Sequence, residues 1–522
     1  MIREISRRKC LRLWLCKPEY MERTKWENRF VLLRFRKKNY MMFLKDLKRF
    51  KMERLYDKLK AYSESDFYAF HMPGHKRNKA LLGIELPYDL DITEIDGFDD
   101  LHHADGILKE EQERAARVFG AEESHFLVNG STAGILSAVM GCTHRGDKIL
   151  VARHCHKSIY HAIYMNGLVP RYVYPEFDIS MHMNGEISKE DVAKALAAEP
   201  DIKAVVIVSP NYDGVVSDVK GIAEVAHSYR IPLIVDEAHG PHFGFHPAFS
   251  GRANDLGADV VINSLHKTLP SLTQTAILHI NGKIVNRRRI KKYLDMLQSS
   301  SPSYIFMASL DACVDFVDGK CENAFELYVE RLQKFREELK PLQHLQILRT
   351  EHYDISKVVI STANANITSP ELAERLRKEY HLEMEMTGGT YVLAMTTVAD
   401  TQEGLDRLKA ALLEIDGQLE AKTAVFGSIE ISGELPRLEQ YFTPQEAADR
   451  EEDGEAEEIP WKESEGHISL EYAYLYPPGS PVIVPGERIS REAVELLCYY
   501  ETQNLQIEGI QTEGKIKVWK HE

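Results

Sequence analysis

Short apolar segments alternate with longer amphipathic segments from about residue 124 of the chain onward. The apolar segments have the continuous character of strands that are buried on both faces, and they lie at 124–128, 148–152, 169–175, 203–210, 232–238 and 258–264. The segments between them have the period of helices that bury one face, and they lie at 132–141, 156–167, 188–199 and 219–230. This alternation predicts a large α/β domain with a mostly parallel sheet and helices on both faces.

A smaller unit follows a helical stretch near 286–318. Its pattern predicts a small α/β domain with strands at 357–363 and 391–398 and helices at 369–381 and 401–416. Residues 431–466 are acidic and poor in apolar side chains, so we expect a solvated connection there. The expected division is a basic extension (1–54), an N-terminal segment with the large domain (55–310), the small α/β domain (311–430), an acidic linker (431–466) and a C-terminal domain (467–522).

Charge and composition restrict the classes of partner. The chain has 522 residues and a formal net charge of −15. Residues 1–54 carry 18 Lys or Arg against 6 Asp or Glu, so the remainder is acidic, at about −27. An acidic body repels phosphate backbones, which argues against a nucleic-acid partner. No apolar run approaches the roughly 18 residues of a membrane span. The sequence therefore predicts neither a nucleic-acid partner nor a membrane partner.

The basic first segment has no continuous apolar region and no small-residue cleavage site, so it is a poor secretory signal. We expect a poorly ordered extension, or a start placed ahead of the true one at Met41, Met42 or Met52. A helix lying on a membrane surface is the alternative. The seven cysteines contain no CxxC pair, which favours reduced thiols and a cytoplasmic protein.

Four segments at or near predicted strand ends carry candidate chemistry. In the first, VNGSTAG, Gly130 permits a tight turn, and Ser131 or Thr132 begins a helix whose free N–H groups suit a phosphate. An ordinary helix cap is the alternative.

The second segment, LIVDEAHGPHF, delivers Asp236 to the end of an apolar strand. A carboxylate there could keep the pyridine nitrogen of pyridoxal phosphate protonated, and His239 could reach the same ring. A capping or salt-bridged aspartate is the alternative. A metal site formed by Asp236, His239 and His242 is also conceivable, although no second ligand motif supports it and we predict no metal.

The third segment, ARHCHKSIYHA, places His156 between a strand and a helix. Its flat ring could stack on an aromatic cofactor, with His154 as a competitor for that role and a packed histidine as the alternative. The fourth segment, INSLHKTLPSLTQTA, sets Lys267 among hydroxyl groups. A lysine between apolar walls partly loses its preference for the charged form and can then react with an aldehyde.

Ser264 and His266, which flank Lys267, could bind the phosphate of the same cofactor, whereas the alternative for the whole segment is a surface turn. Taken together, the four segments follow the order in which the large domain of a pyridoxal-phosphate enzyme supplies its parts. We therefore predict pyridoxal 5'-phosphate as the cofactor.

With these four segments the chain resembles the ornithine/lysine/arginine decarboxylase family, which consists of pyridoxal-phosphate enzymes of the aspartate-aminotransferase fold type (fold type I). The shared motifs include FYAFHMPGHKRN, GSTAGI, HKS, VDEAHG, SLHKTLPSLTQ, SSPSY and YPPGSPVIVPGE, and they span residues 67–487. The resemblance implies that Lys267 attaches the cofactor, Asp236 pairs with its pyridine nitrogen and His156 stacks on its ring. The remaining cofactor-binding residues implied are Ser131, Thr132, Ala133, His239, Ser264 and His266.

The resemblance also implies decarboxylation of a basic amino acid, ranked arginine, then lysine, then ornithine, in polyamine or diamine biosynthesis. An aminotransferase or another carbanion-forming enzyme, and a non-catalytic regulatory relative, remain alternatives. A homodimer or tetramer is implied, with the active site between subunits and QSSSPSY reaching the partner's cofactor. Fewer than seventy residues precede the shared motifs and they do not have the pattern of an α/β domain, so we expect no wing domain like that of the family's larger members and no decamer. The candidates for reading the substrate's basic end are Glu487 and Asp99, for which ordinary surface charge is the alternative.

Overall fold

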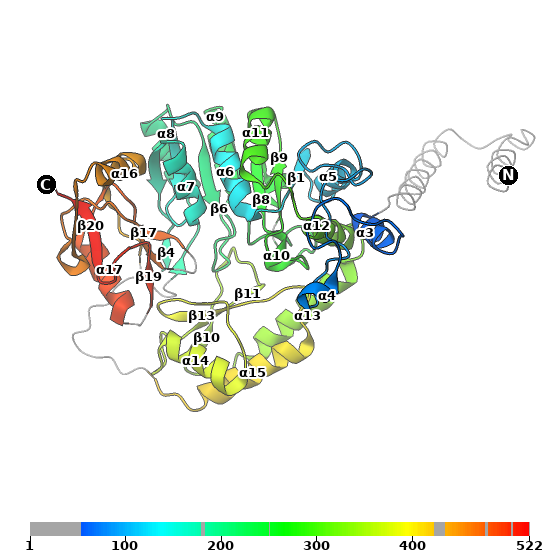
Figure 1. The fold of residues 1–522 in the computed structure, drawn as a ribbon. Coiled ribbons are helices and arrows are strands. Elements are labelled where there is room, and N and C mark those ends of the chain that lie inside the picture. Colours follow the sequence, from blue (N-terminus) through cyan, green and yellow to red (C-terminus); the bar gives the residue numbers. More distant parts are fainter. Residues whose placement is uncertain are drawn as a thin grey trace, which may run out of the picture. The chain divides into compact units, whose positions relative to one another are not determined.

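The structure of the chain is a computed structural model, and it describes residues 54–178, 183–249, 251–421, 434–475, 479–502 and 505–520. The chain separates into two units, Met1–Glu53 and Arg54–Glu522. The first unit lies outside the described residues, and with it lies the prediction of a poorly ordered extension. The fold described below is that of the second unit (Figure 1).

A seven-stranded sheet forms the centre of the large domain, in the order β1-β9-β8-β7-β6-β2-β3. The strands are β1 (Glu123–Leu127), β2 (Lys148–Ala152), β3 (Val169–Val173), β6 (Val205–Val208), β7 (Leu233–Asp236), β8 (Val260–Asn263) and β9 (Ala276–Ile280). β2, β3, β6, β7 and β8 run parallel, whereas β9 is antiparallel to β1 and to β8. The mostly parallel sheet was predicted, and it is confirmed. β9 was not indicated by the alternation of strands and helices, because it follows β8 after only a short segment.

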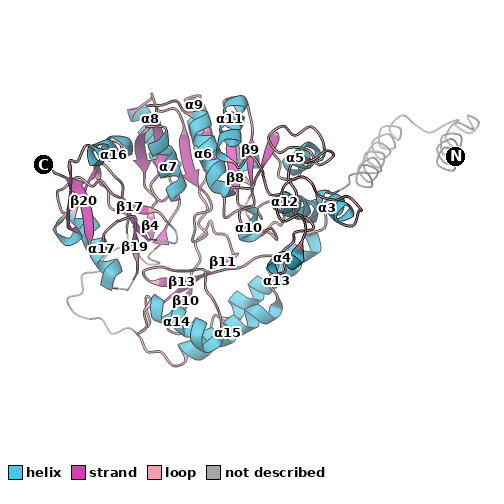
Figure 2. Ribbon diagram, viewed as in Figure 1, coloured by secondary structure: helices cyan, strands magenta, loops and turns pink. Residues whose placement is uncertain are grey.

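Helices cover both faces of this sheet (Figure 2). The helices of the large domain are α3 (Leu55–Ser63), α4 (Lys79–Leu82), α5 (Ile107–Val118), α6 (Gly130–Cys142), α7 (Lys157–Met165), α8 (Lys189–Ala198), α9 (Val219–Ser228), α10 (Leu265–Thr268), α11 (Arg287–Leu297) and α12 (Tyr304–Val317), with a 3-10 turn η1 (Ala253–Leu256). Successive strand side chains point to opposite faces, so Phe126 packs into the cluster that contains α5 and α12. Its neighbour Leu127 packs into the cluster that contains α6, α7 and α11. None of the described helices is long and apolar enough to cross a membrane.

The small domain has a four-stranded antiparallel sheet in the order β10-β11-β13-β12. Its strands are β10 (Gln346–Ile347), β11 (Lys357–Ser361), β12 (Met386–Thr387) and β13 (Tyr391–Met395), and its helices are α13 (Glu322–Glu338), α14 (Ser369–Tyr380) and α15 (Gln402–Asp416). A capping box fixes the start of α14, where Thr368 and Glu371 each bond the other's backbone N–H group. The domain meets the large domain through a backbone hydrogen bond of 2.8 Å from Asp354 N to Gly214 O.

The third part of the fold contains several two- and three-stranded sheets. Its strands are β14 (Glu439–Gln440), β15 (Ala456–Pro460), β16 (Ala473–Leu475), β17 (Pro481–Ile483), β18 (Glu487–Arg488), β19 (Ile507–Glu508) and β20 (Lys515–Trp519), and its helices are α16 (Pro444–Glu452), α17 (Arg491–Thr502) and a 3-10 turn η2 (Trp461–Glu463). A buried cluster that includes Trp461, Ile483, Leu496 and Val518 forms its core.

The structure differs from the expected solvated connection at 431–466. Residues 434–466 include β14, α16, β15 and η2, and β15 pairs along its length with β20. Residues 431–433 lie outside the described part of the chain. Few apolar side chains are needed in this segment because little of it is buried. α16 buries only Pro444 and Ala447, and no residue of β15 is fully buried. Backbone pairing, which the composition does not reveal, holds this segment to the C-terminal domain.

Candidate active site

A pocket lies at the carboxyl ends of the parallel strands, the edge at which open α/β sheets bind ligands. Asp236 is the last residue of β7, Lys267 lies in α10 just after β8, and His156 follows β2. The segment after β6 adds Asn211, Tyr212 and Asp213. The pocket encloses about 610 Å³ of empty space, part of it open to solvent. The remaining lining residues are Ser131, Ile135, His154, Asn184, Val208, Ala238, His239 and Ser480.

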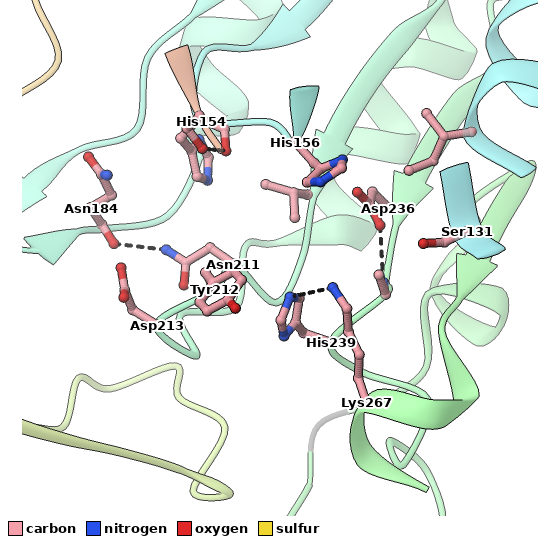
Figure 3. A pocket seen from close by; sticks show the side chains of 14 residues that line it. Ser131, His154, His156, Asn184, Asn211, Tyr212, Asp213, Asp236, His239 and Lys267 are labelled. Atoms are coloured by element: carbon pink, nitrogen blue, oxygen red, sulfur yellow. Dashed lines mark hydrogen bonds between the residues drawn. The ribbon is translucent and has the colours of Figure 1, made fainter. Parts of the chain in front are cut away.

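Lys267 points toward His239 in this pocket, and its Nζ lies 2.9 Å from His239 Nε2 (Figure 3). Burial lowers the pKa of Lys267 below its ordinary value, while the carboxylates of Asp236 and Glu385 partly oppose that shift. The neutral amine, which is the nucleophilic form, is therefore more accessible here than on the surface.

His239 is buried, and burial, followed by the nearby charge of Lys267, holds the pKa of its imidazole well below the ordinary value. The ring is consequently neutral, and its Nε2 can accept a hydrogen bond from the Lys267 ammonium group. Its Nδ1 is buried without a hydrogen-bond partner. Since buried polar atoms normally find a partner, this atom marks a position where a bound molecule would supply one.

Asp236 is 3% exposed, and its Oδ1 accepts a hydrogen bond of 3.1 Å from Ala238 N. Burial raises the pKa of its carboxyl group, and Lys267 works in the opposite direction. A cation placed beside this carboxylate would favour the ionised form strongly. The protonated pyridine nitrogen of pyridoxal phosphate is such a cation.

The start of α6 faces the pocket with open hydrogen-bonding capacity. Its N-cap residue, Asn129, makes no side-chain cap, and the preceding turn is completed by Gly130 at a φ of +73°. Ser131 lines the pocket, and its Oγ accepts a hydrogen bond of 2.9 Å from Ser264 Oγ. Free N–H groups at a helix start and two hydroxyl groups suit a phosphate.

The remaining predicted phosphate ligands lie differently. Ala133 is buried and Thr132 is exposed in the first turn of α6, and neither side chain lines the pocket. His266 does not line it either, because its Nδ1 is bonded to Thr275 O at 3.0 Å. The structure therefore brings Ser131 to the pocket and holds the ring of His266 against the backbone. Ser264 is fully buried, does not line the pocket and reaches the start of α6 through its hydrogen bond to Ser131.

Both histidines proposed for stacking line the pocket. His156 caps α7 through Nδ1, which accepts a hydrogen bond of 3.2 Å from Ser158 N, and burial lowers its pKa to about 4. His154 is also buried, with its pKa lowered to about 4 by burial. Figure 3 places His156 near Asp236 and His154 toward Asn184. That arrangement favours His156 for a ring anchored at Asp236.

These features fit pyridoxal phosphate. The pocket offers an amine for its aldehyde, a buried carboxylate for its pyridine nitrogen and an uncapped helix start for its phosphate. The residues thus match the aldehyde, the pyridine nitrogen and the phosphate of the cofactor separately.

The two residues proposed to read the substrate's basic end lie elsewhere. Glu487 is fully buried and forms an ion pair of 2.8 Å with Arg153, which is also fully buried. Asp99 accepts hydrogen bonds from the backbone N–H groups of Gly106 and Leu108 at the start of α5. Although burial works against its charge, these and neighbouring N–H groups lower the pKa of Asp99. Both carboxylates already have structural partners, so neither prediction is supported by the pocket.

The metal alternative also finds no support in the geometry. His242 lies between Thr268 Oγ1, at 3.0 Å, and Asp354 Oδ1, at 3.1 Å, and it does not line the pocket. Across the described ranges, no group of three His, Cys, Asp or Glu residues is suited to hold a metal ion.

The sequence reasoning missed several pocket residues. Asn211, Tyr212 and Asp213 follow β6, so the strand-end rule that identified Asp236 could have identified them in SPNYDG. Asn184 belongs to the hairpin of β4 (Phe177–Asp178) and β5 (Met183–Asn184), and Ser480 comes from the C-terminal domain. No local sequence pattern marks Asn184 or Ser480, because the tertiary fold brings these two segments to the pocket from distant parts of the chain.

Comparison with known protein families gives two matches. The family described as Orn/Lys/Arg decarboxylase, major domain, matches residues 53–370, and the family described as Orn/Lys/Arg decarboxylase, C-terminal domain, matches residues 433–514. The second match includes most of the segment that we had expected to be a linker.

The chain is also similar to individual proteins and solved structures. It is 33% identical over 471 residues to an arginine decarboxylase of Bacillus subtilis, covering 87% of this chain and 95% of that protein. An arginine decarboxylase of Bacillus anthracis is 32% identical over 487 residues, covering 89% of this chain and 97% of that protein. Among solved structures, the lysine decarboxylase LdcF of Francisella novicida superimposes with a TM-score of 0.77 at 20% identity, covering 92% of this chain and 83% of that one. This likeness confirms the predicted fold class.

Proposed function

The chain belongs to the Orn/Lys/Arg decarboxylase family, and on that premise we propose that it removes the α-carboxylate of a basic amino acid as CO₂. The proposed substrate order is arginine, then lysine, then ornithine, and the names of the two Bacillus relatives support arginine. The observation that carries the proposal is one pocket that holds a nucleophilic Lys267, a buried Asp236 and an uncapped helix start. Pyridoxal phosphate requires these three features together.

Each residue has a defined task at the cofactor. Lys267 would hold the aldehyde, Asp236 would keep the pyridine nitrogen protonated, and Ser131 with the start of α6 would hold the phosphate. His156 would cover one face of the ring. When bound, pyridoxal phosphate supplies an electron sink for the electron pair left at Cα as the carboxylate departs.

Lys267 is the better candidate to return a proton to Cα. The lowered pKa of Lys267 makes its ammonium group acidic enough to donate a proton. The nearby carboxylate of Asp236 partly opposes that shift and so favours the charged ammonium form. His156, with a pKa of about 4, is neutral at physiological pH and carries no extra proton to give. Asp236 and His239 are buried at this end of the pocket, which limits the access of water to the proton donor.

The test of this function is a substrate panel. The cofactor-loaded protein is incubated with arginine, lysine and ornithine, and both CO₂ and the cognate amine are measured. We expect the two products in equal amounts, with arginine consumed fastest. Formation of a keto acid without CO₂ would instead identify an aminotransferase, and absence of any turnover would identify a non-catalytic relative.

We also infer a homodimer or tetramer with the active site between subunits. The N-terminal segment exposes Phe67, Tyr68, Phe70 and Met72 by 63–89%, which is apolar surface that a second copy would cover. Ser299 and Ser301, between α11 and α12, are exposed and could reach a partner. Light scattering coupled to gel filtration tests this assembly. A monomer would contradict it.

The inferred compartment is the cytoplasm, and the inferred role is polyamine or diamine biosynthesis. The five described cysteines form no disulfide, as a reducing compartment would favour. Decarboxylation of a basic amino acid yields a diamine or a guanidino amine, which supports the role. Fractionation of cells, with measurement of amine pools after loss of the gene, would test both inferences.

A further inference from the structure

A second cavity adjoins the pocket of Lys267. The two share Asn184, Asp213 and Ser480 in their linings. The second cavity is lined further by methionine and tyrosine side chains and by a pair of glycines, which include Met386, Tyr391, Tyr499 and Gly389. Methylene groups pack well against such walls, and the faces of tyrosine rings attract cations.

Asp213 supplies the carboxylate at the junction of the two cavities. Among the residues that line either cavity, the acidic ones are Asp213 and Asp236, and Asp236 lies in the first cavity alone. Figure 3 shows Asp213 on the side of the pocket away from Asp236 and Ser131. A molecule anchored at Lys267 would therefore have to extend across the pocket to meet it.

The position of Asp213 is fixed by its neighbours. Asn211 Oδ1 accepts hydrogen bonds from Gly214 N at 3.0 Å and Val215 N at 2.8 Å, which closes the turn that holds Asp213. The Tyr391 hydroxyl group donates to Asp213 Oδ1. The side chain is only 7% exposed, so its orientation does not depend on solvent.

The junction has unused capacity to accept hydrogen bonds. No ion pair to Asp213 is present in the described part of the chain, although Lys357 attracts its charge from β11. Burial raises the pKa of Asp213 to about 6, against the opposing effects of Tyr391 and Lys357, so the group is ionised at neutral pH. A buried carboxylate without an ion pair suits a cation with N–H donors.

We propose that the second cavity receives the side chain of the amino-acid substrate and that Asp213 binds its cationic end. The proposal rests on the proposed function for the identity of the substrate. A guanidinium group could bind the Asp213 carboxylate through two parallel N–H groups, whereas the ammonium group of a shorter side chain offers only a point charge. The arrangement thus explains a preference for arginine by length and by donor geometry.

The test compares a cation with its neutral isostere on the cofactor-loaded protein. Calorimetry measures the binding of agmatine, which keeps the guanidinium group, and of N-carbamoylputrescine, which replaces it with a neutral ureido group. Asp213→Asn removes the charge but retains an acceptor for Tyr391. Asp453→Asn makes the same change at an exposed position and is the matched control.

We expect the wild-type protein and Asp453→Asn to prefer agmatine by about 10- to 100-fold, the value of a charge-assisted hydrogen bond. Asp213→Asn should lose most of that preference and show a matching fall in kcat/KM for arginine. Its visible cofactor absorbance should remain, which would show that the fold and the cofactor site are intact. Retention of the preference in Asp213→Asn, or its absence in the wild-type protein, would overturn the proposal.

Binding and turnover fail separately in this design. If the wild-type protein prefers agmatine but releases no CO₂ from arginine, the proposed reaction is wrong while the cationic subsite stands. If arginine is decarboxylated but Asp213→Asn discriminates as the wild-type protein does, the reaction stands and the subsite is wrong.

Gly389→Ala tests the cavity independently of the charge. A Cβ at Gly389 would lie 3.3 Å from Tyr499 Cε1, and the φ of this glycine is outside the left-handed region. We expect the added methyl group to weaken agmatine by at least about 5-fold and to leave the shorter putrescine nearly unaffected. Equal affinities for agmatine before and after the change would show that the side chain does not enter this cavity.

Discussion

The buried ion pair between Arg153 and Glu487 joins the large domain to the C-terminal domain, and its removal should cost stability rather than substrate affinity. Both side chains are fully buried, with 2.8 Å between Arg153 Nη2 and Glu487 Oε2. Arg153 also donates to Val482 O at 3.0 Å, and Glu487 accepts from Val484 N at 2.8 Å. Glu487→Ala would leave the guanidinium group buried without its counter-charge. Loss of one partner of such a pair costs about 3–5 kcal/mol.

Urea unfolding followed by tryptophan fluorescence measures this cost. Trp461 and Trp519 both lie in the C-terminal domain, so replacing Trp14 and Trp26 with phenylalanine makes the signal specific to it. We expect Glu487→Ala to lower the free energy of unfolding by about 3–5 kcal/mol. Glu513→Ala, at an exposed position of the same domain, should have little effect and is the matched control.

A double variant separates charge from packing. Arg153→Met combined with Glu487→Leu removes both charges and retains apolar volume, so it should recover most of the lost stability. The KM for arginine should be unchanged in Glu487→Ala. A normal unfolding curve with a raised KM would refute this reasoning and would restore Glu487 as a substrate contact.

Four further predictions address the cofactor site and the core. Asp236→Asn should lower kcat on the order of 10²- to 10³-fold with cofactor still bound, measured by steady-state kinetics and cofactor content. Ser131→Ala should weaken cofactor affinity by about 10-fold, measured by titration of the apoprotein. Burial raises the pKa of Glu237 from 4.5 to about 8, so the folded state binds one proton more than the unfolded state between those values. Stability should therefore fall by about 1.4 kcal/mol per pH unit as pH rises through that window, and Glu237→Gln should abolish this contribution in urea unfolding. Gly141→Ala should destabilise by about 1–3 kcal/mol, since its Cβ would lie 2.6 Å from Ile290 Cγ1, and urea unfolding measures the loss.

Each of these four expectations has a specific result that would contradict it. Full activity of Asp236→Asn would remove the need for a charged partner, and unchanged affinity in Ser131→Ala would move the phosphate elsewhere. An identical pH slope in Glu237→Gln would mean that this carboxyl group does not retain its proton in the fold. An unchanged unfolding curve for Gly141→Ala would show that α6 and α11 can separate at no cost.

The strands and helices of the large domain were predictable because the local pattern of apolar and polar residues determines them. Continuous apolar runs such as Leu233–Val235 can be buried only in a sheet covered on both faces, and the residues at their ends then meet at one edge. Lys267, Asp236, His156 and Ser131 could be identified for this reason, since each lies next to a strand or at a helix start.

The remaining features depend on contacts between distant segments. The sequence does not reveal that Arg153 lies opposite Glu487, which is 334 positions away, so a structural carboxylate was assigned to the substrate. The edge strand β15 was missed because pairing with β20, not apolar content, holds it in place. Asp213 lies in a strand-end segment, but only the fold brings Tyr391 of β13 to its carboxylate and the second cavity beside it.

The most direct test of the central claim is the site of covalent attachment of the cofactor. The protein loaded with pyridoxal phosphate is reduced with borohydride, which makes lysine–aldehyde linkages permanent, and its peptides are mapped by mass spectrometry. The account predicts a single modified lysine, Lys267, and no modification of Lys357, the other buried lysine nearby. Modification of another lysine in place of Lys267, or none at all in protein that retains the cofactor, would contradict it.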